Sequence, residues 1–391
     1  MTLEEQIRRR YRRSFAVLAA FLGAGLLASV AIGELNRYFQ WGENALQAIW
    51  SRHAWPPLLL TLISMIVPAS LILGIVQAAP AVLVWWERKV SAHIQSRLGP
   101  MYVGGWHGWA QTIADAIKLT TKQDITPAGA DRWVHRLAPV IAFIPAYVCF
   151  APIPFGKSLA AVNLDTGLLF ILSISGLSVL GILMAGWGSA NKYSMLGGLR
   201  AAAQAVSYEV PRVLSVVPIV MWAGTLSLSK IVDAQSHRLF GFIPKWFIFY
   251  PVVGQIAFLI YLISTVAETN RTPFDIAEAE SELVAGFHTE YSGIKFAFFF
   301  LAEYAYVFLG SALGAALFLG GGDALPGLGW IPSWTWFLGK TMFLVFFFLW
   351  FRWTYPRLRV DRLMDFCWKF LVPWSFANIV LIGLIITVFK S

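Results

Sequence analysis

Residues 294–319 read IKFAFFFLAEYAYVFLGSALGAALFL and carry only two charged side chains, Lys295 and Glu303. A helix rises 1.5 Å per residue, so this stretch is long enough to cross a hydrocarbon core of about 30 Å. It therefore predicts a transmembrane helix. An ionised group deep in a span costs roughly 2.5–3.5 kcal/mol on insertion scales. We expect Glu303 to be protonated, paired or facing a wet cavity.

Similar apolar windows lie on both sides of this stretch. They fall near residues 15–33, 57–86, 134–152, 166–188, 203–226, 247–267, 333–352 and 370–389. The whole chain is 58% hydrophobic and 13% charged, whereas soluble domains are about 25% charged. Its mean hydropathy is +0.65. A water-soluble globule is excluded, and the fold class predicted is an all-α integral membrane protein with about nine transmembrane helices.

The basic residues predict the orientation of these spans. With the N-terminus inside, 22 of the 30 Lys and Arg residues fall in cytoplasmic segments. This distribution fits the positive-inside rule and places the C-terminus in the periplasm. The net charge of +9 is then explained by basic cytoplasmic loops, and no nucleic-acid partner is expected. The three longest polar segments also fall on the cytoplasmic side.

The N-terminal part differs from a cleavable signal peptide. Five arginines precede the apolar run 15–33, which is too long for a typical signal core and has no clear cleavage site. We interpret residues 1–55 as an extension with a retained anchor, and residues 56–391 as the main membrane domain.

The first long polar segment contains a second kind of helix. From Trp106 to Lys122, polar side chains recur every three or four residues on one side, and Trp106, Trp109, Ile113 and Ile117 lie on the other. The segment is short and flanked by glycine and proline. It predicts an amphipathic helix lying in the cytoplasmic membrane interface, although a surface helix packed on a partner remains compatible.

Acidic residues gather between the predicted spans 247–267 and 294–319. This segment holds six acids, Glu268, Asp275, Glu278, Glu280, Glu282 and Glu290, and the base Arg271. Closely spaced carboxylates in a poorly solvated site cannot all ionise, so we expect some of their pKa values to rise. Interleaved apolar residues such as Phe274 and Phe287 weaken the alternative of a solvated acidic loop. For Glu209, at the end of a span, an ordinary boundary carboxylate and a functional one remain equally open.

Cofactor chemistry has no support in the sequence. The two cysteines, Cys149 and Cys367, are far apart, and the six histidines show no metal-ligand spacing. No phosphate-binding loop or nucleophile elbow is present. We therefore expect no cofactor on this chain and no independent catalytic activity.

Three cytoplasmic blocks resemble a known family. The first contains Glu87-Arg88-Lys89, QSRLGP at 95–100, Gln111 and ADAIKL at 114–119. The second runs from Gly186-Trp187 through Asn191-Lys192-Tyr193 to Ser207-Tyr208-Glu209-Val210. The third is AETNRTPFD at 267–275, continuing through Glu278, Glu280 and Glu282 to Glu290-Tyr291. From about residue 57 onward the chain resembles the H subunits of NADH:quinone oxidoreductase, respiratory complex I.

That resemblance implies a role for specific residues. The amphipathic helix and neighbouring spans would frame the entrance for ubiquinone or menaquinone. The quinone-chamber residues implied are Arg88, Arg97, Trp106, Asp115, Lys118, Arg271 and Phe274. The acids that would couple quinone reduction to proton pumping are Glu209, Glu268, Asp275, Glu278, Glu280, Glu282, Glu290 and Glu303, with Asp115 leading into the chain of carboxylates.

The resemblance also implies partners and a location. FMN and iron-sulfur clusters would lie on peripheral subunits, and quinone would be the substrate. Small membrane subunits, antiporter-like subunits and lipid would surround this chain in the bacterial cytoplasmic membrane. The family usually has eight spans, so residues 1–55 are an addition. Met101 and the bulky His107-Gly108-Trp109 also depart from the usual pattern and leave the lining of the chamber mouth open.

Two other interpretations compete with this one. A membrane anchor of an energy-converting hydrogenase or formate hydrogenlyase shares the acidic loop, but the blocks at 95–100 and 114–119 favour the quinone enzyme. A self-contained secondary transporter would have two pseudo-symmetric halves. The sequence shows no such repeat.

Overall fold

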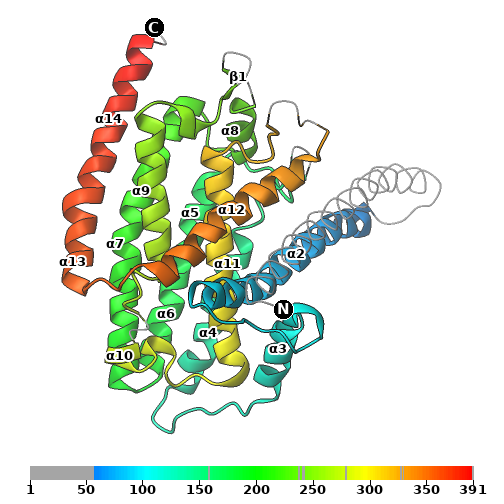
Figure 1. The fold of residues 1–391 in the computed structure, drawn as a ribbon, viewed down its shortest axis with the longest axis vertical. Coiled ribbons are helices and arrows are strands. Elements are labelled where there is room, and N and C mark those ends of the chain that lie inside the picture. Colours follow the sequence, from blue (N-terminus) through cyan, green and yellow to red (C-terminus); the bar gives the residue numbers. More distant parts are fainter. Residues whose placement is uncertain are drawn as a thin grey trace, which may run out of the picture.

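The protein is seen here in a computed structural model, which describes residues 57–156, 159–236, 238–239, 243–277, 280–325, 328 and 330–389. Its long helices form a bundle (Figure 1). They are α2 (Pro57–Ile94), α4 (Arg132–Val148), α5 (Gly167–Ser175), α6 (Leu177–Gly188), α7 (Lys192–Ala223), α9 (Val253–Glu268), α11 (Gly293–Phe318), α12 (Ser333–Thr354) and α14 (Val372–Phe389). In Figure 1, α7, α9, α11 and α14 run along the long axis, and α12 crosses α11 obliquely.

Shorter elements connect these helices. They are η1 (Trp106–Gly108), α3 (Gln111–Thr121), α8 (Leu228–Ala234), η2 (Phe247–Phe249), α10 (Glu280–Leu283), η3 (Gly286–His288), α13 (Val360–Phe366) and the π-helical η4 (Cys367–Leu371). The strands β1 (Arg238–Leu239) and β2 (Ile243–Pro244) pair antiparallel, with Leu239 opposite Ile243.

The described helices are those of an integral membrane protein. Five are long and apolar enough to cross a membrane: Gly167–Gly188, Lys192–Ala223, Gly293–Phe318, Ser333–Thr354 and Val360–Val388. Val253–Glu268 is apolar but shorter. The all-helical membrane class predicted from the sequence is therefore confirmed at this level, whereas the number of nine spans stays a prediction. Residues 1–55, with the proposed anchor 15–33, lie outside the described residues.

Several predicted boundaries were wrong in an informative way. α2 continues to Ile94 and α7 starts at Lys192, so both helices extend beyond the apolar window into polar sequence. In contrast, the span predicted from residue 247 begins as α9 only at Val253, since Phe247–Phe249 form a 3-10 turn. Hydropathy marks the membrane-compatible part of a helix rather than its hydrogen-bonded ends.

The helix α11 is the centre of the core. All residues from Val307 to Phe318 are buried, and their side chains pack on α9, α12 and α2. The glycines let these helices approach closely. A Cβ on Gly310 would lie 2.3 Å from Cγ2 of Thr265 on α9, and one on Gly181 would lie 2.6 Å from the backbone nitrogen of Ala142. Small residues at such crossings are typical of membrane bundles.

The far end of α11 is fixed by two polar side chains. The Lys340 ammonium of α12 donates to the carbonyls of Leu319 (2.7 Å), Gly321 (2.9 Å) and Asp323 (2.7 Å). Gln235 Nε2 donates to the Ala316 carbonyl at 2.9 Å. The last carbonyls of a helix lack partners within it, so these donors satisfy acceptors that would otherwise be buried unpaired.

The predicted amphipathic helix is shorter than its polar stripe suggested. α3 starts at Gln111 because Gly104, Gly105, His107 and Gly108 all have positive φ angles, which an α-helix excludes. The apolar face of α3 is not covered by the rest of the described chain: Ile113 is 50% exposed and Ile117 is 59% exposed. The helix therefore exists, while its position in a membrane interface stays a prediction.

Candidate functional site

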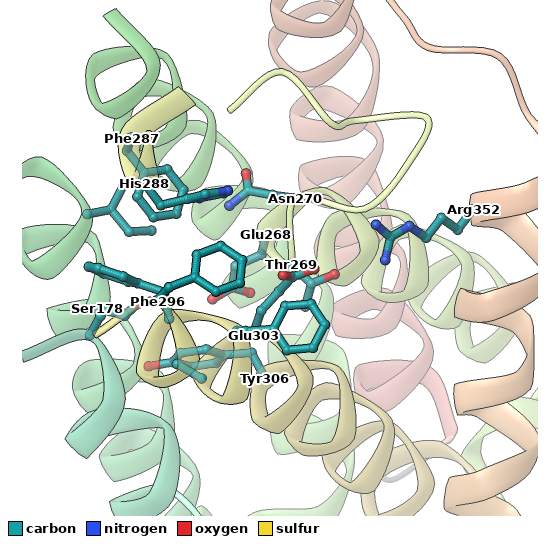
Figure 2. Close-up of a pocket in the computed structure, with 15 residues that line it drawn as sticks. Ser178, Glu268, Thr269, Asn270, Phe287, His288, Phe296, Glu303, Tyr306 and Arg352 are labelled. Carbon is teal, nitrogen blue, oxygen red and sulfur yellow. The ribbon is translucent and has the colours of Figure 1, made fainter. Parts of the chain in front are cut away.

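A cavity of about 280 Å³ lies against the acid-bearing part of α11. Its walls combine aromatic rings with charged groups. The lining residues are Ala142, Ser178, Ile182, Glu268, Thr269, Asn270, Phe287, His288, Phe296, Phe299, Phe300, Ala302, Glu303, Tyr306 and Arg352. Figure 2 shows Glu268, Thr269 and Glu303 near the centre, with His288 and Arg352 on opposite sides. Two carboxylates from different helices thus meet at one cavity.

One carboxylate, Glu303, is paired with a buried arginine. Arg271 Nε lies 2.8 Å from Glu303 Oε1, and Arg271 Nη1 lies 2.9 Å from Glu87 Oε2. The Arg271 side chain is only 2% exposed and also lies over the Tyr304 ring, 4.4 Å from its centroid. Of the alternatives expected for Glu303, which were protonation, pairing or a place at a cavity, the structure shows the pairing and the cavity.

Glu87 joins this pair to a second arginine. Its carboxylate accepts from Arg271, from Arg352 Nη1 at 2.7 Å and from the Tyr304 hydroxyl at 2.8 Å. We call Glu87, Arg271, Glu303, Arg352 and Tyr304 the Arg271 network. Two acids balance two bases, so the charges are mutually compensated despite burial. Removing one partner from such a buried set leaves an uncompensated charge, which typically costs 3–5 kcal/mol.

The other cavity acid, Glu268, belongs to a separate ion pair. It contacts Arg212 of α7, which is 5% exposed. Arg212 Nη2 also donates to Ser175 Oγ at 2.8 Å. Glu209, three residues earlier on the same helix, lies beside Gly176. The cavity is therefore lined both by members of the Arg271 network and by Glu268 of the Arg212–Glu268 pair.

The remaining acids of the predicted loop lie elsewhere. Glu282 pairs with Arg200 at 2.7 Å, and Asp275 lies 3.7 Å from Arg357, both in a groove of about 720 Å³. Glu290 accepts from Asn191 Nδ2 at 2.6 Å. Glu278 and the side chain of Glu280 lie outside the described residues. The acids are therefore distributed over at least three places rather than one cluster.

Glu282 is not among the acids whose pKa rises. The hydrogen bond from Arg200 lowers the pKa of Glu282 from its ordinary value, and the side chain is 57% exposed. The expected rise in pKa does not occur at this acid because a cation faces it and water reaches it.

The residues assigned to the quinone chamber fall into two groups. Arg88 pairs with Asp115 at 2.5 Å, which ties α2 to α3. Trp106 and Lys118 are exposed nearby, and the exposed Arg97 donates to Gln95 Oε1 at 2.6 Å. Arg271 and Phe274, in contrast, are buried in the bundle, where Phe274 packs against Tyr208 with ring centroids 5.4 Å apart.

Comparison with known proteins decides the family. The family model described as NADH dehydrogenase matches residues 67–383. The H subunit of NADH-quinone oxidoreductase from Geobacillus kaustophilus is 48% identical over 316 residues, covering 81% of this chain and 92% of that protein. The protein of the same name from Anoxybacillus flavithermus is 51% identical over 299 residues, covering 76% of this chain and 87% of that protein.

The chain belongs to this family. The resemblance to H subunits of complex I is confirmed, and these relatives favour it over the hydrogenase anchor. As a member of the H-subunit family, the chain is a subunit of an oxidoreductase complex. Its apolar helices and its bacterial relatives identify it as an integral protein of a bacterial membrane.

For this H-subunit family member, the sequence did not identify three of the six charged residues in the Arg271 network and the Arg212–Glu268 pair. Glu87, Arg212, Arg352 and Tyr304 were not predicted as site residues. Arg212 pairs with the cavity acid Glu268, and the other three belong to the Arg271 network. Arg212 lay inside the predicted span 203–226, where an unpaired cation is expensive. That signal could have identified it. Glu87 and Arg352 lay at span ends, where they were indistinguishable from orientation-setting charges.

His288 is a further cavity residue that the sequence did not single out. It follows the acidic segment and is T-shaped against Phe296, with ring centroids 5.4 Å apart. Burial lowers the pKa of His288 to about 4. Its imidazole is therefore neutral at physiological pH and adds a polar but uncharged group to the cavity wall.

Proposed function

We propose that this chain is the membrane subunit of a proton-pumping NADH:quinone oxidoreductase that links quinone reduction to proton movement at the cavity. The name of its relatives supports the reaction, because they are NADH-quinone oxidoreductase H subunits. The single observation that carries the coupling role is the placement of two carboxylates, Glu268 and Glu303, on one cavity with separate arginine partners.

The physical basis is the response of buried ion pairs to charge. Reduction of a quinone to a quinol takes up two electrons and two protons. In a poorly solvated environment a nearby charge acts strongly on a carboxylate, because water screens it weakly. A change at the quinone therefore alters the balance between each acid and its arginine. The acids then release or take up protons as a coupled set rather than singly.

The quinone would enter beside α3. Arg88 and Asp115 join α2 to α3, and the apolar side chains Trp106, Ile113 and Ile117 are exposed along this region. Such a face suits the boundary between headgroups and acyl chains. FMN and iron-sulfur clusters would be held by peripheral subunits. The positive-inside distribution further supports a cytoplasmic N-terminus and a periplasmic C-terminus.

The other predicted acids would act around this centre. Glu209 lies near Arg212 on α7, and Asp275, Glu282 and Glu290 lie toward the cytoplasmic loops. We assign the direct coupling role to Glu268 and Glu303 and a peripheral one to these acids. Antiporter-like and small membrane subunits would receive the signal.

Substitution of the cavity acids tests the proposal. Glu303→Gln in the assembled complex keeps the size of the side chain but removes its charge. We expect NADH:quinone activity and proton translocation to fall at least tenfold, because a positioned proton-transfer group typically contributes at least this much to a rate. Asp165→Asn is the control, because Asp165 is 86% exposed, pairs with Lys230 and does not line the cavity. Equal activity and pumping in wild type and Glu303→Gln would overturn the coupling role.

A further inference from the structure

The two cavity networks are joined by one short loop. Glu268 and Arg271 are three residues apart between α9 and Phe274, yet Glu268 reaches Arg212 and Arg271 reaches Glu87 and Glu303. Any shift of this loop therefore moves both networks together. What holds the loop determines whether the cavity acids keep their partners.

A buried amide bridges the two ends of this loop. Gln204 Nε2 on α7 donates to the carbonyl of Ala267 at 2.7 Å and to the carbonyl of Phe274 at 2.7 Å. Gln204 is 0% exposed. An amide NH2 group has two hydrogens, so one nitrogen can hold two carbonyls at once. The bridge therefore ties the first and last residues of the segment 267–274 to one side chain.

The neighbouring turns of α7 hold the same loop through other groups. Tyr208 packs on the Phe274 ring, and its hydroxyl donates to the Leu363 carbonyl at 2.9 Å. Arg212 pairs with Glu268. Gln204, Tyr208 and Arg212 are spaced by four residues, so they lie on one face of the helix. This face contacts the loop at its peptide groups, at a ring and at a carboxylate.

We propose that Gln204 is a positioning residue for coupling, which sets the loop 267–274 so that Glu268 and Arg271 meet their partners at the cavity. This inference rests on the proposed function. The two hydrogen bonds of Gln204 go to backbone carbonyls of the loop, so its effect passes through the loop. A displacement of about 1 Å in a positioned group can lower a rate by about 100-fold, which makes such a clamp consequential.

The side chain offers a clean substitution. Gln204 Oε1 has no hydrogen-bond partner among the described residues. Gln204→Met therefore keeps the length and burial of the side chain and removes only the two donated hydrogen bonds. Gln204→Glu has the same length and donates at most one hydrogen bond, when protonated.

The chain also offers a matched control. Gln235 is likewise 0% exposed, and its Nε2 also donates to two backbone carbonyls, of Ala316 (2.9 Å) and Ile231 (3.3 Å). In addition, its Oε1 accepts from the backbone N–H groups of Gly320 (3.0 Å) and Phe247 (3.3 Å). It lies at the opposite end of α11, far from the cavity. Gln235→Met removes more hydrogen bonds than Gln204→Met, so a general loss of stability from a buried glutamine should be at least as large in Gln235→Met.

The experiment compares Gln204→Met, Gln235→Met and Glu268→Gln in the purified, assembled complex. We expect Gln204→Met to lower kcat for quinone reduction about tenfold or more with little change in KM for quinone. We also expect fewer protons pumped per electron and faster hydrogen exchange over residues 267–276. Gln235→Met should match wild type in all three. Gln204→Glu should give values between those of wild type and Gln204→Met for these three quantities. It replaces Gln204→Met if that variant does not assemble.

The outcomes separate this inference from the proposed function. If Glu268→Gln lowers pumping but Gln204→Met behaves like Gln235→Met, the positioning role is overturned and the proposed function stands. If Glu268→Gln leaves rate and pumping unchanged, the proposed function fails. Hydrogen exchange over residues 267–276 then still tests the clamp, and unchanged exchange in Gln204→Met would reject it.

Discussion

Arg271 is the residue on which the Arg271 network depends. It is 2% exposed and faces two carboxylates, so its charge is tolerated inside the bundle only because both acids are present. A guanidinium can present donors to both acids in fixed directions, whereas an ammonium is a single point charge. Arginine and lysine are therefore not interchangeable at position 271.

Arg271→Met should lower the free energy of unfolding by about 3–5 kcal/mol, because it leaves Glu87 and Glu303 without their shared cation. Thermal unfolding of the assembled complex and its quinone activity measure this effect. Arg359→Met should cause little change, since Arg359 is 86% exposed and its contact with Asp361 is 3.5 Å. Similar loss in both variants would contradict the special role of Arg271.

His288 gives the site a defined pH dependence of stability. Its folded-state pKa is lowered to about 4 by burial, below the ordinary value of 6.5. The unfolded chain therefore takes up a proton first, and the contribution of neutral His288 is full above pH 6.5 and lost as the pH falls toward 4. Each pKa unit corresponds to 1.36 kcal/mol, so the total is about 3 kcal/mol.

His288→Asn should reduce the loss of stability between pH 6.5 and 4 by about that amount. Thermal unfolding of the complex at several pH values checks this. His93→Asn is the control, because His93 is exposed at the end of α2. The same pH slope in wild type and His288→Asn would show that folding does not lower the pKa of His288.

Sequence reasoning at this scale succeeded where a residue conflicted with its surroundings. Glu303 stood out because an acid interrupts an apolar run, and the structure gives it a cation. Glu87 did not stand out, because a charge at the end of a span is ordinary. Its importance comes from Arg271 and Arg352, which are 184 and 265 residues away along the chain. Such pairings are fixed by the packing of helices and leave no local pattern.

At the scale of elements, close helix crossings shape the cavity. α4 and α6 both line it, through Ala142, Ser178 and Ile182. They approach closely where Gly181 faces the backbone of Ala142, and a Cβ there would lie 2.6 Å from the nitrogen. Backbone atoms cannot move aside as a flexible side chain can, so this crossing has no room for a larger residue.

Gly181→Ala should destabilise the protein by about 1–3 kcal/mol, the usual range for overpacking. Gly339→Ala is a matched control, because a Cβ at Gly339 of α12 meets no atom within 4 Å. Both changes add the same methyl group to a helix. The difference in thermal stability between the two variants therefore measures the cost of the close contact at the α4–α6 crossing. Equal stability of the two variants would mean that α4 and α6 are less closely packed than the structure shows.

The elements also show where pattern reading has its limits. The polar stripe of residues 106–122 predicted a helix, and α3 forms over most of it. Its start could not be read from the stripe, because positive φ angles at Gly104, Gly105 and Gly108 end the helical geometry before Gln111. Glycine permits such angles without requiring them, so they follow from the fold around them.

At the scale of the whole molecule, the apolar windows identified a membrane bundle, and the motifs identified its family. Neither showed that the acids divide between an inner cavity and an outer groove. The inner set, Glu268 and Glu303, meets arginines inside the bundle, and the outer set, including Glu282, meets arginines near water. Both sets come from one acidic stretch and its neighbouring helix. The division arises because the chain folds back between α9 and α11.

Redox-induced infrared difference spectroscopy of the purified complex tests coupling at the cavity most directly. It detects carboxyl groups that change protonation or pairing when quinone is reduced. We predict a carboxyl signal on quinone reduction that is lost or reduced in Glu303→Gln and Glu268→Gln and retained in Asp165→Asn. Spectra that are identical in wild type, Glu303→Gln and Glu268→Gln would contradict the assignment of coupling to these two acids.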